Sequence, residues 1–375
     1  MTPCLDDRFK PAIKQFGKAI SGAQPFSENA RLSCATTTNK NLGMAVSAIY
    51  IKEHFHESAK TEIGDIVKSM IEAFRQNLDN TVWLDEETKL KAEEKINKTR
   101  FALGYPDFLL NKTALNEYYG DLVIESGKYF ENILNVRKFQ ITKGFKKLNN
   151  DESIYEDDWF EPPTVVNAYF ENDKNRILLP ASFLQPPIYH KDFPNAIKYG
   201  AIGAFIGHEV THGFDSNGRS FNKKGKFESW WTNSSLESFT EREQCFIDQY
   251  DQFSLYNESI SGDISKGENI ADNAGIQLAF KVYNQWLKTR TNIEKEAEML
   301  PGLEFLSLTQ LFFLSYAQSW CDYVRPEAAI AKSSDEHPPG SVRILGTLQN
   351  FDEFSKAFQC SENSKMNPSK RCKLW

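Results

Sequence analysis

Residues 200–215, with the sequence GAIGAFIGHEVTHGFD, constrain the fold of this chain more than any other stretch. They contain the pattern His-Glu-x-x-His, and the stretch predicts a helix that ends at Gly213. On a helix that advances about 100° per residue, His208 and His212 lie about 40° apart, with Glu209 in the same sector. Two neutral imidazoles at this spacing can bind one Zn²⁺ ion and leave the carboxylate beside the open position of the metal. Metal-assisted hydrolysis requires this arrangement.

The length of 375 residues allows two domains, but we prefer one domain of about 250 residues with an appendage. A net charge of -7, a pI near 5.6 and the lack of a Lys/Arg block argue against a nucleic acid or an anionic membrane surface as a partner. No run approaches the roughly 18 apolar residues of a membrane span, and the first residues do not resemble a signal peptide. The chain is therefore either cytosolic or lacks its beginning. Four N-x-S/T sequons favour a secreted context instead: Asn97, Asn111, Asn233 and Asn257.

Apolar periodicity predicts mainly α structure with a small β component, an α+β fold. The acidic, proline-containing stretch at 151–163 predicts a linker, which divides the chain into a helical segment at 1–150 and a second domain at 151–375. A helix capped by Asp85 is expected to run to Arg100 with its charges facing solvent. The other predicted helices lie within residues 5–20, 38–80, 113–120 and 126–147, after Trp231 through Cys245, from Gly267 onward and within 303–324.

The β-rich runs at 164–170 and 176–179 are separated by a polar loop, which predicts a hairpin just before the His-Glu-x-x-His helix. An exposed strand at this place could pair with an extended peptide through its backbone. An ordinary edge strand with no ligand explains the pattern equally well.

Two further stretches carry candidate site residues. Glu268 and Asp272 share one helix face, so Glu268 could complete a zinc site of two His and one Glu, while Asp272 hydrogen-bonds a ligating imidazole. Surface acids favoured by the helix dipole are the alternative. Residues 335–343 place His337 and Arg343 on a proline-stiffened turn, where the imidazole could donate to an oxyanion or simply be solvated.

Four motifs together resemble the neprilysin and endothelin-converting-enzyme family of zinc metallopeptidases. They are VVNA at 165–168, IGHEVTHGFD at 206–215, GENIADN at 267–273 and HPPGSVR at 337–343. The resemblance covers the C-terminal half of that family. It implies a thermolysin-like zincin catalytic domain with part of a helical second domain, acting as a metalloendopeptidase on short peptides at the amino side of hydrophobic residues.

The resemblance also implies a role for each matching residue. His208, His212 and Glu268 would hold one Zn²⁺ ion, Glu209 would be the general base, and Asp272 would orient a zinc-bound histidine. His337 would stabilise the tetrahedral intermediate. The substrate contacts would come from Asn167 and Ala168, which align the peptide backbone, from Arg343, which binds a carbonyl, and from the apolar pocket of Phe183, Ile188, Phe205 and Trp320.

The pairing of the cysteines is a further expectation that rests on the resemblance alone. Cys245 and Cys372 match a family disulfide. The family partners of Cys34, Cys321 and Cys360 lie upstream of Met1, and Cys4 has no counterpart that we can assign. The family setting implies a glycosylated extracellular or plasma-membrane ectodomain, and we expect this chain to be a truncated gene model or an isoform. The competing hypotheses are a catalytically silent zinc-binding or regulatory fragment and a cytosolic peptidase with reduced thiols.

Overall fold

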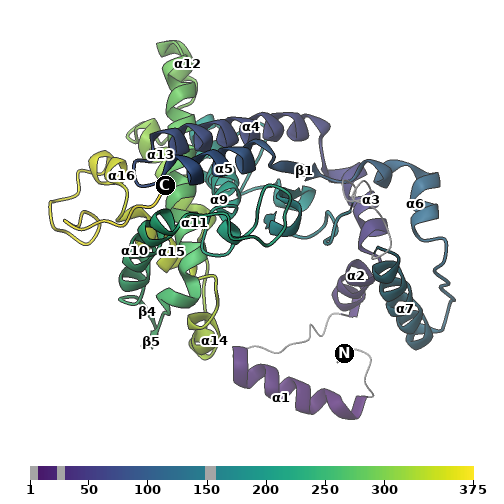
Figure 1. Cartoon of the computed structure of the whole chain (residues 1–375). Coiled ribbons are helices and arrows are strands. Elements are labelled where there is room, and N and C mark those ends of the chain that lie inside the picture. Colours follow the sequence, from purple (N-terminus) through teal and green to yellow (C-terminus); the bar gives the residue numbers. More distant parts are fainter. Residues whose placement is uncertain (1–6, 23–29, 148–157) are drawn as a thin grey trace. The chain divides into compact units, whose positions relative to one another are not determined.

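The computed structural model describes residues 7–22, 30–147 and 158–375 (Figure 1). The chain forms two compact units. Unit 1 comprises Met1–Glu57, Ala102–Asn167 and Pro180–Ser182, and unit 2 comprises Ser58–Phe101, Ala168–Leu179 and Phe183–Trp375. Residues 58–101, which the sequence suggested to belong to an N-terminal domain, are therefore part of the same compact unit as the C-terminal region. Most of the suggested linker at 151–163 lies outside the described residues.

Unit 1 is built from helices around a small buried apolar core. Its elements are η2 (Asp7–Phe9), α1 (Lys10–Ser21), α2 (Ala30–Asn41), α3 (Gly43–His54), η3 (Asp107–Leu110), α6 (Lys112–Tyr118) and α7 (Tyr129–Lys147). Met44, Ile51, Leu109 and Val136 are among its buried apolar residues. Asn111 begins α6, because its side chain accepts hydrogen bonds from the backbone N–H groups of Thr113 and Ala114.

Unit 2 holds the remaining helices and the hairpin. Its elements are α4 (Glu57–Asn80), α5 (Glu86–Asn97), β2 (Tyr169–Glu171), η5 (Asn172–Lys174), β3 (Arg176–Pro180), α8 (Asn195–Lys198), the π-helical turn η7 (Tyr199–Gly203), α9 (Ala204–His212), η8 (Gly218–Ser220), α10 (Asn233–Tyr250), β4 (Ser254–Leu255), β5 (Glu258–Ser259), α11 (Gly262–Lys288), α12 (Asn292–Glu296), α13 (Leu308–Ser319), η9 (Pro326–Ala328), α14 (Ala329–Ser333), α15 (Gly340–Leu348) and α16 (Asp352–Ala357). The short helix η6 (Ala181–Phe183) is divided, with Ala181 and Ser182 in unit 1 and Phe183 in unit 2. Long helices and short strands confirm the predicted mainly α fold with a small β component.

The hairpin forms as predicted. β2 and β3 pair antiparallel with Tyr169 opposite Leu178 and Glu171 opposite Arg176. β1 (Arg100–Gly104) pairs on the other side of β3, so the strand order is β1-β3-β2. β2 is therefore an edge strand of this sheet.

Helices α9 and α11 lie side by side in the centre of unit 2 (Figure 1). Two glycines allow this close contact. A Cβ atom on Gly207 would lie 2.4 Å from the carbonyl oxygen of Gly275, and one on Gly275 would lie 2.5 Å from the backbone nitrogen of His208. Because neither glycine carries a side chain, the two backbones touch and His208 is brought against the polar face of α11.

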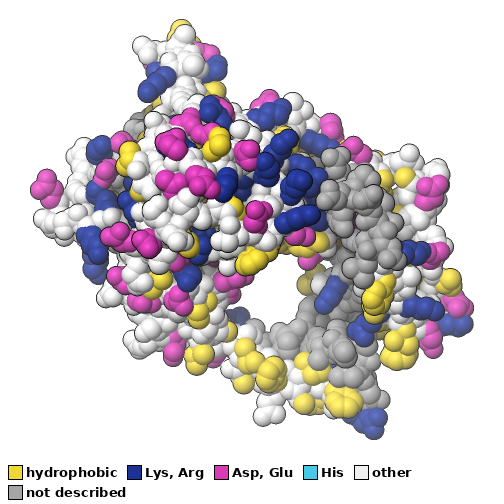
Figure 2. All heavy atoms as spheres, viewed as in Figure 1, with side chains coloured by type: hydrophobic (Ala, Val, Ile, Leu, Met, Phe, Trp, Pro, Cys, Tyr) yellow, Lys and Arg dark blue, Asp and Glu magenta, His cyan; other side chains and the backbone are white. Residues whose placement is uncertain are grey.

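The α5 helix begins as predicted, with Asp85 accepting a hydrogen bond from the backbone of Thr88. It ends at Asn97, and Arg100 already belongs to β1. Acidic and basic side chains are interspersed over α4 and α5 (Figure 2). The prediction that the charged side chains of this helix face solvent is wrong at Lys95, which is only 1% exposed.

Helix α11 begins five residues before the predicted start. Its N-cap is Ser261, whose side chain accepts a hydrogen bond from the backbone of Ile264. The alternative reading of Glu268 and Asp272 as surface acids in a first turn is therefore wrong, since both are buried and lie beyond the first turn.

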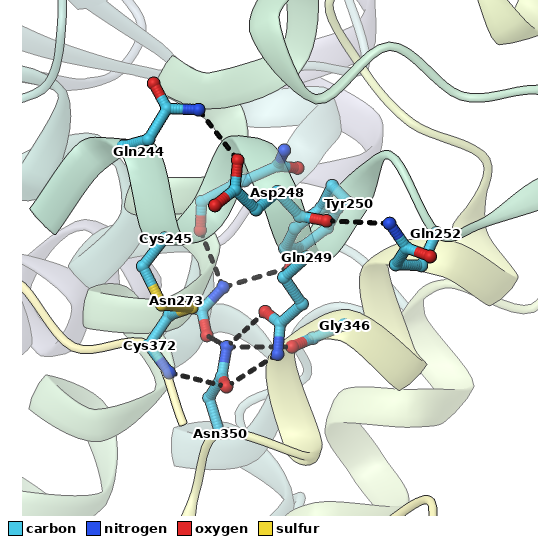
Figure 3. The surroundings of a disulfide bond; sticks show 11 residues. Gln244, Cys245, Asp248, Gln249, Tyr250, Gln252, Asn273, Gly346, Asn350 and Cys372 are labelled. Atoms are coloured by element: carbon cyan, nitrogen blue, oxygen red, sulfur yellow. Dashed lines mark hydrogen bonds between the residues drawn. A yellow bond between two sulfur atoms is a disulfide. The ribbon is translucent and has the colours of Figure 1, made fainter. Parts of the chain in front are cut away.

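The disulfide between Cys245 and Cys372 is present, with a Cα–Cα distance of 5.6 Å (Figure 3). Cys34, Cys321 and Cys360 are free. Cys4 lies outside the described residues. None of the described helices is long and apolar enough to cross a membrane.

Candidate metal centre and active site

Three predicted metal ligands meet between α9 and α11. The Nε2 atoms of His208 and His212 are 2.8 Å apart. Oxygens of the Glu268 carboxylate lie 3.4 Å from Nε2 of His208 and 3.3 Å from Nε2 of His212. All three ligand atoms fall within 4.8 Å of one another. The four-residue spacing on α9 and the glycine contact with α11 produce this cluster.

A carboxylate orients each histidine ring by contacting Nδ1, the nitrogen that faces away from the cluster. Nδ1 of His208 lies 2.9 Å from Asp272, and Nδ1 of His212 lies 2.6 Å from Asp215. Because a carboxylate only accepts hydrogen bonds, we assign a proton to Nδ1 of each ring, which makes Nε2 the atom of each ring that would bind a metal at the shared centre. The role of Asp272 was predicted, whereas Asp215 was given no role. Its position three residues after His212, just beyond the helix end, was the available signal.

Arg343 joins this layer from α15. Its Nε and Nη2 groups each donate to Asp272 at 2.6 Å, and Nη2 also donates to Glu268 at 3.3 Å. The guanidinium is buried, so its charge balances the carboxylates in a medium where unpaired charge is costly. In this structure Arg343 thus holds Asp272 in place, and its contact with a substrate carbonyl stays a prediction.

The protonation of the cluster follows from burial and charge together. Burial alone would raise the pKa of Glu268, but the two imidazoles hold it well below its ordinary value. Burial likewise opposes the charged form of His212, yet Glu268 and Asp215 raise its pKa well above the usual range. The raised pKa of His212 shows that this site favours positive charge. Two imidazoles and one carboxylate are also the ligand set of a catalytic zinc site. The residues present therefore fit Zn²⁺.

Glu209 lies beside these ligands on α9 and is 4% exposed. Burial raises the pKa of its carboxyl group. A carboxylate whose pKa moves toward neutrality is a better proton acceptor at physiological pH, which suits a general base.

His337 lies at the solvent side of the cluster. Its Nε2 is 3.5 Å from Glu268, and about half of its side chain is exposed, at 47%. An imidazole that borders the metal ligands and also faces solvent can meet a ligand that enters from outside.

Three residues of the predicted apolar pocket form a continuous row of aromatic rings, in which one pair is edge to face and the other is tilted. The rings of Phe183 and Phe205 lie 5.1 Å apart, and those of Phe205 and Trp320 lie 4.9 Å apart. The Arg343 guanidinium lies 3.8 Å above the Trp320 ring, which links this row of rings to the metal cluster. Ile188 is half-buried between η6 and α8.

Asn167 and Ala168 directly precede the edge strand β2. Asn167 is exposed, whereas Ala168 is buried. The boundary between the two units falls between them, since Asn167 ends the segment Ala102–Asn167 of unit 1 and Ala168 begins the segment Ala168–Leu179 of unit 2. Their predicted contacts with a substrate backbone stay predictions.

This fold and this two-His, one-Glu cluster are those of a zinc-peptidase site, and the chain belongs to peptidase family M13. Family models match residues 167–374 and residues 1–106. The predicted resemblance to the neprilysin and endothelin-converting-enzyme family is confirmed.

Among its relatives, the chain is similar to neprilysin of Oryctolagus cuniculus, with 42% identity over 99% of this chain and 49% of that protein. It is 39% identical to an endothelin-converting enzyme homolog of Locusta migratoria, over 100% of this chain and 51% of that protein. The chain thus spans about half the length of the curated relatives it matches.

Solved structures give the same result. The zinc metalloprotease Zmp1 of Mycobacterium tuberculosis, in complex with an inhibitor, matches with a TM-score of 0.84 and 28% identity over 96% of this chain and 53% of that chain. PepO of Lactobacillus rhamnosis matches with a TM-score of 0.85 and 27% identity over 100% of this chain and 56% of that chain.

Proposed function

We propose that this chain is a zinc metalloendopeptidase that cleaves short peptides at the amino side of hydrophobic residues. The observation that carries the proposal is the largely buried cluster of His208, His212 and Glu268, with Glu209 on the same helix as the two histidines, in a chain of family M13. Each ligating histidine is held by its own carboxylate, as expected for a site that binds a metal.

The chemistry divides among the residues of the cluster. His208, His212 and Glu268 hold the metal. When bound, Zn²⁺ supplies a Lewis acid that makes water nucleophilic near neutral pH. Glu209 takes the proton of the attacking water and passes it to the leaving amine. His337 donates a hydrogen bond to the negative oxygen that develops on the scissile carbonyl.

Substrate binding uses the edge strand and the row of aromatic rings. An extended peptide adds beside β2, where Asn167 and Ala168 align its backbone. Arg343 binds a carbonyl of the peptide. The pocket of Phe183, Ile188, Phe205 and Trp320 accepts a large apolar side chain after the scissile bond, because burying such a side chain is worth about 1.5–3 kcal/mol.

We also propose an extracellular setting, which the disulfide supports because such bonds persist in oxidising compartments. The four sequon asparagines Asn97, Asn111, Asn233 and Asn257 are all exposed, so each can receive a glycan. A mass decrease of the native protein after enzymatic deglycosylation is expected. Bare asparagines throughout would favour the cytosolic alternative.

Zinc content and peptide turnover, measured on the same purified chain, test the function. We expect about one zinc per chain and cleavage that a chelator abolishes and zinc restores. Glu209→Gln should retain zinc and lose about 10²- to 10⁴-fold in turnover, the usual contribution of a general base. Glu237→Gln, at an exposed position of α10, is the matched control and should match wild type.

The second candidate is a catalytically silent zinc-binding or regulatory fragment, for which the cluster of metal ligands alone would suffice. Stoichiometric zinc without cleavage of any peptide would establish this alternative. Undiminished cleavage by Glu209→Gln would remove Glu209 from the mechanism.

A further inference from the structure

Lys95 is a buried lysine whose ammonium group is surrounded by backbone carbonyls. Its Nζ donates to the carbonyl oxygens of Gly213 at 2.6 Å, Gly218 at 2.6 Å and Phe221 at 2.7 Å. These bonds use all three N–H donors of the ammonium group. Within the part of the chain that the structure describes, no carboxylate lies in ion-pair distance of Lys95.

The three carbonyls belong to the loop that leaves the zinc-binding helix. Gly213 is the C-cap of α9, directly after His212, and Gly218 and Phe221 close the loop. Asp215 lies between them. Its Oδ1 accepts hydrogen bonds from the backbone of Asn217 at 2.8 Å and of Gly218 at 2.7 Å, while its Oδ2 accepts from Nδ1 of His212 at 2.6 Å.

Lys95 therefore ties together the two sides of the turn that carries Asp215. It also places positive charge at the C-terminal end of α9, where the helix dipole favours it. The aromatic ring of Phe214 lies beneath the ammonium group at 5.3 Å. The loop is thus anchored at both ends and at its centre by a side chain from a different helix.

Burying the charged ammonium group of Lys95 at this position carries a large desolvation cost. Burial lowers the pKa of Lys95 to about 7, although the charge of Asp215 opposes this shift. Apolar packing would satisfy a purely structural position at less free-energy cost than a buried ammonium group. A role in fixing the geometry of Asp215 explains why the cation is there.

We propose that Lys95 is a positioning residue of the metal centre: it fixes the 213–221 loop so that Asp215 stays on Nδ1 of His212 and Nε2 stays directed at the metal. This inference rests on the assignment of His212 as a ligand in the proposed function. It extends the centre to α5, which lies more than a hundred residues earlier in the sequence.

Zinc affinity, measured by competition with a chromogenic chelator on the full chain, tests the proposal apart from catalysis. Lys95→Met keeps the length of the side chain but removes its donors, and should weaken zinc binding about 10- to 100-fold, the usual effect of losing a partner behind a metal ligand. Lys98→Met, at an exposed position just after α5, is the matched control and should bind zinc like wild type.

A double-mutant cycle separates positioning from general loosening of the fold. If Lys95 acts through Asp215, Lys95→Met combined with Asp215→Ala should lose little more affinity than Asp215→Ala alone. If Lys95→Met does not fold, Lys95→Arg replaces it in both comparisons. Arginine keeps the charge, but its planar fork cannot place three donors on carbonyls that converge on one atom, so a smaller loss is expected.

Wild-type zinc affinity in a folded Lys95 variant would overturn the proposal. The proposal would also fail if the loss of zinc affinity in the double variant equalled the sum of the losses in Lys95→Met and Asp215→Ala. Failure of wild-type protein to cleave peptides would instead contradict the proposed peptidase function and leave this test intact, because the readout is metal binding.

Discussion

The two compact units differ in what they bury and what they expose. Among the described residues, the buried charged side chains all lie in unit 2, and they include Lys95, Glu268, Asp272 and Arg343. Large apolar side chains are exposed in both units, but they make up a larger share of unit 1, where examples are Phe16 on α1 and Phe130, Leu134, Ile141 and Phe145 on α7. Buried charge is costly and needs a well-packed surrounding core, whereas exposed apolar faces contribute little to stability. The comparison teaches that the stability and the chemistry of the described chain are concentrated in unit 2.

The largest expected effect comes from unpairing a buried charge in unit 2. Asp272→Ala leaves the Arg343 guanidinium without its principal partner, so the free energy of unfolding should fall by about 3–5 kcal/mol. Urea unfolding measures this change. Asp263→Ala, at an exposed position of the same helix, should change stability by less than about 0.5 kcal/mol. Equal losses in the two variants would contradict the special cost of buried charge here.

A pair of phenylalanines compares the units directly. Phe74 is 1% exposed in unit 2 and packs against Phe214 and Trp375, while Phe145 is 65% exposed in unit 1. Phe74→Ala should lower the free energy of unfolding by about 3–5 kcal/mol, because it leaves a cavity in the core. Phe145→Ala should stay within about 0.5 kcal/mol of wild type. Chemical denaturation followed by circular dichroism checks both, and a larger loss at Phe145 would reverse the comparison.

Loss of the disulfide should lower the free energy of unfolding slightly less than the two preceding substitutions do. Cys245 and Cys372 are 127 residues apart, so by the chain-entropy model their bond constrains the unfolded chain by up to about 4–5 kcal/mol. Replacing both cysteines with serine should lower the free energy of unfolding by about 2–5 kcal/mol, whereas Cys34→Ser in unit 1 should have no measurable effect. Thiol counting on the unfolded oxidised chain should find four free thiols and one bridge. Three bridges with no free thiol would refute the predicted pairing.

The smallest effect concerns the start of α5 and depends on pH. Burial alone would raise the pKa of Asp85, but hydrogen bonds from Ser235, Thr232 and Thr88 hold it well below the ordinary value. A depressed pKa means that the stabilisation by Asp85 is present above the unfolded value of about 3.9 and is lost as the pH falls toward the folded value.

Asp85→Ala should therefore lower the free energy of unfolding by about 0.5–2 kcal/mol at pH 7 and by less at pH 3. Thermal unfolding at the two pH values measures the difference, with the exposed Asp65→Ala on α4 as control. A gap between wild type and Asp85→Ala that does not shrink in acid would show that the carboxylate charge is not the cause.

Local patterns predicted the helices, the hairpin and the two histidine ligands because each depends on a short spacing. The His208 and His212 pair, the Asp85 cap and the β2–β3 hairpin are of this kind. The sequence predicts the start of α11 at Gly267 from the acids that follow it, whereas the helix begins after the Ser261 cap.

The remaining features depend on distant parts of the chain. Lys95 belongs to a charged helix that should face solvent by its pattern, and only the loop at 213–221 explains its burial. The contact of Gly207 with Gly275 and the bonds of Arg343 to Asp272 likewise join segments far apart in sequence. Periodicity has no information about such contacts, since they are set by tertiary packing.

Hydrogen–deuterium exchange on the full chain, with and without zinc, tests most directly the claim that stability and metal binding are concentrated in unit 2. We predict slow exchange in α9 and α11, further slowed when zinc is added, and faster exchange in α1 and α7 that zinc does not change. Equal protection in both units, or slowing by zinc in α7 as large as in α9, would contradict the account.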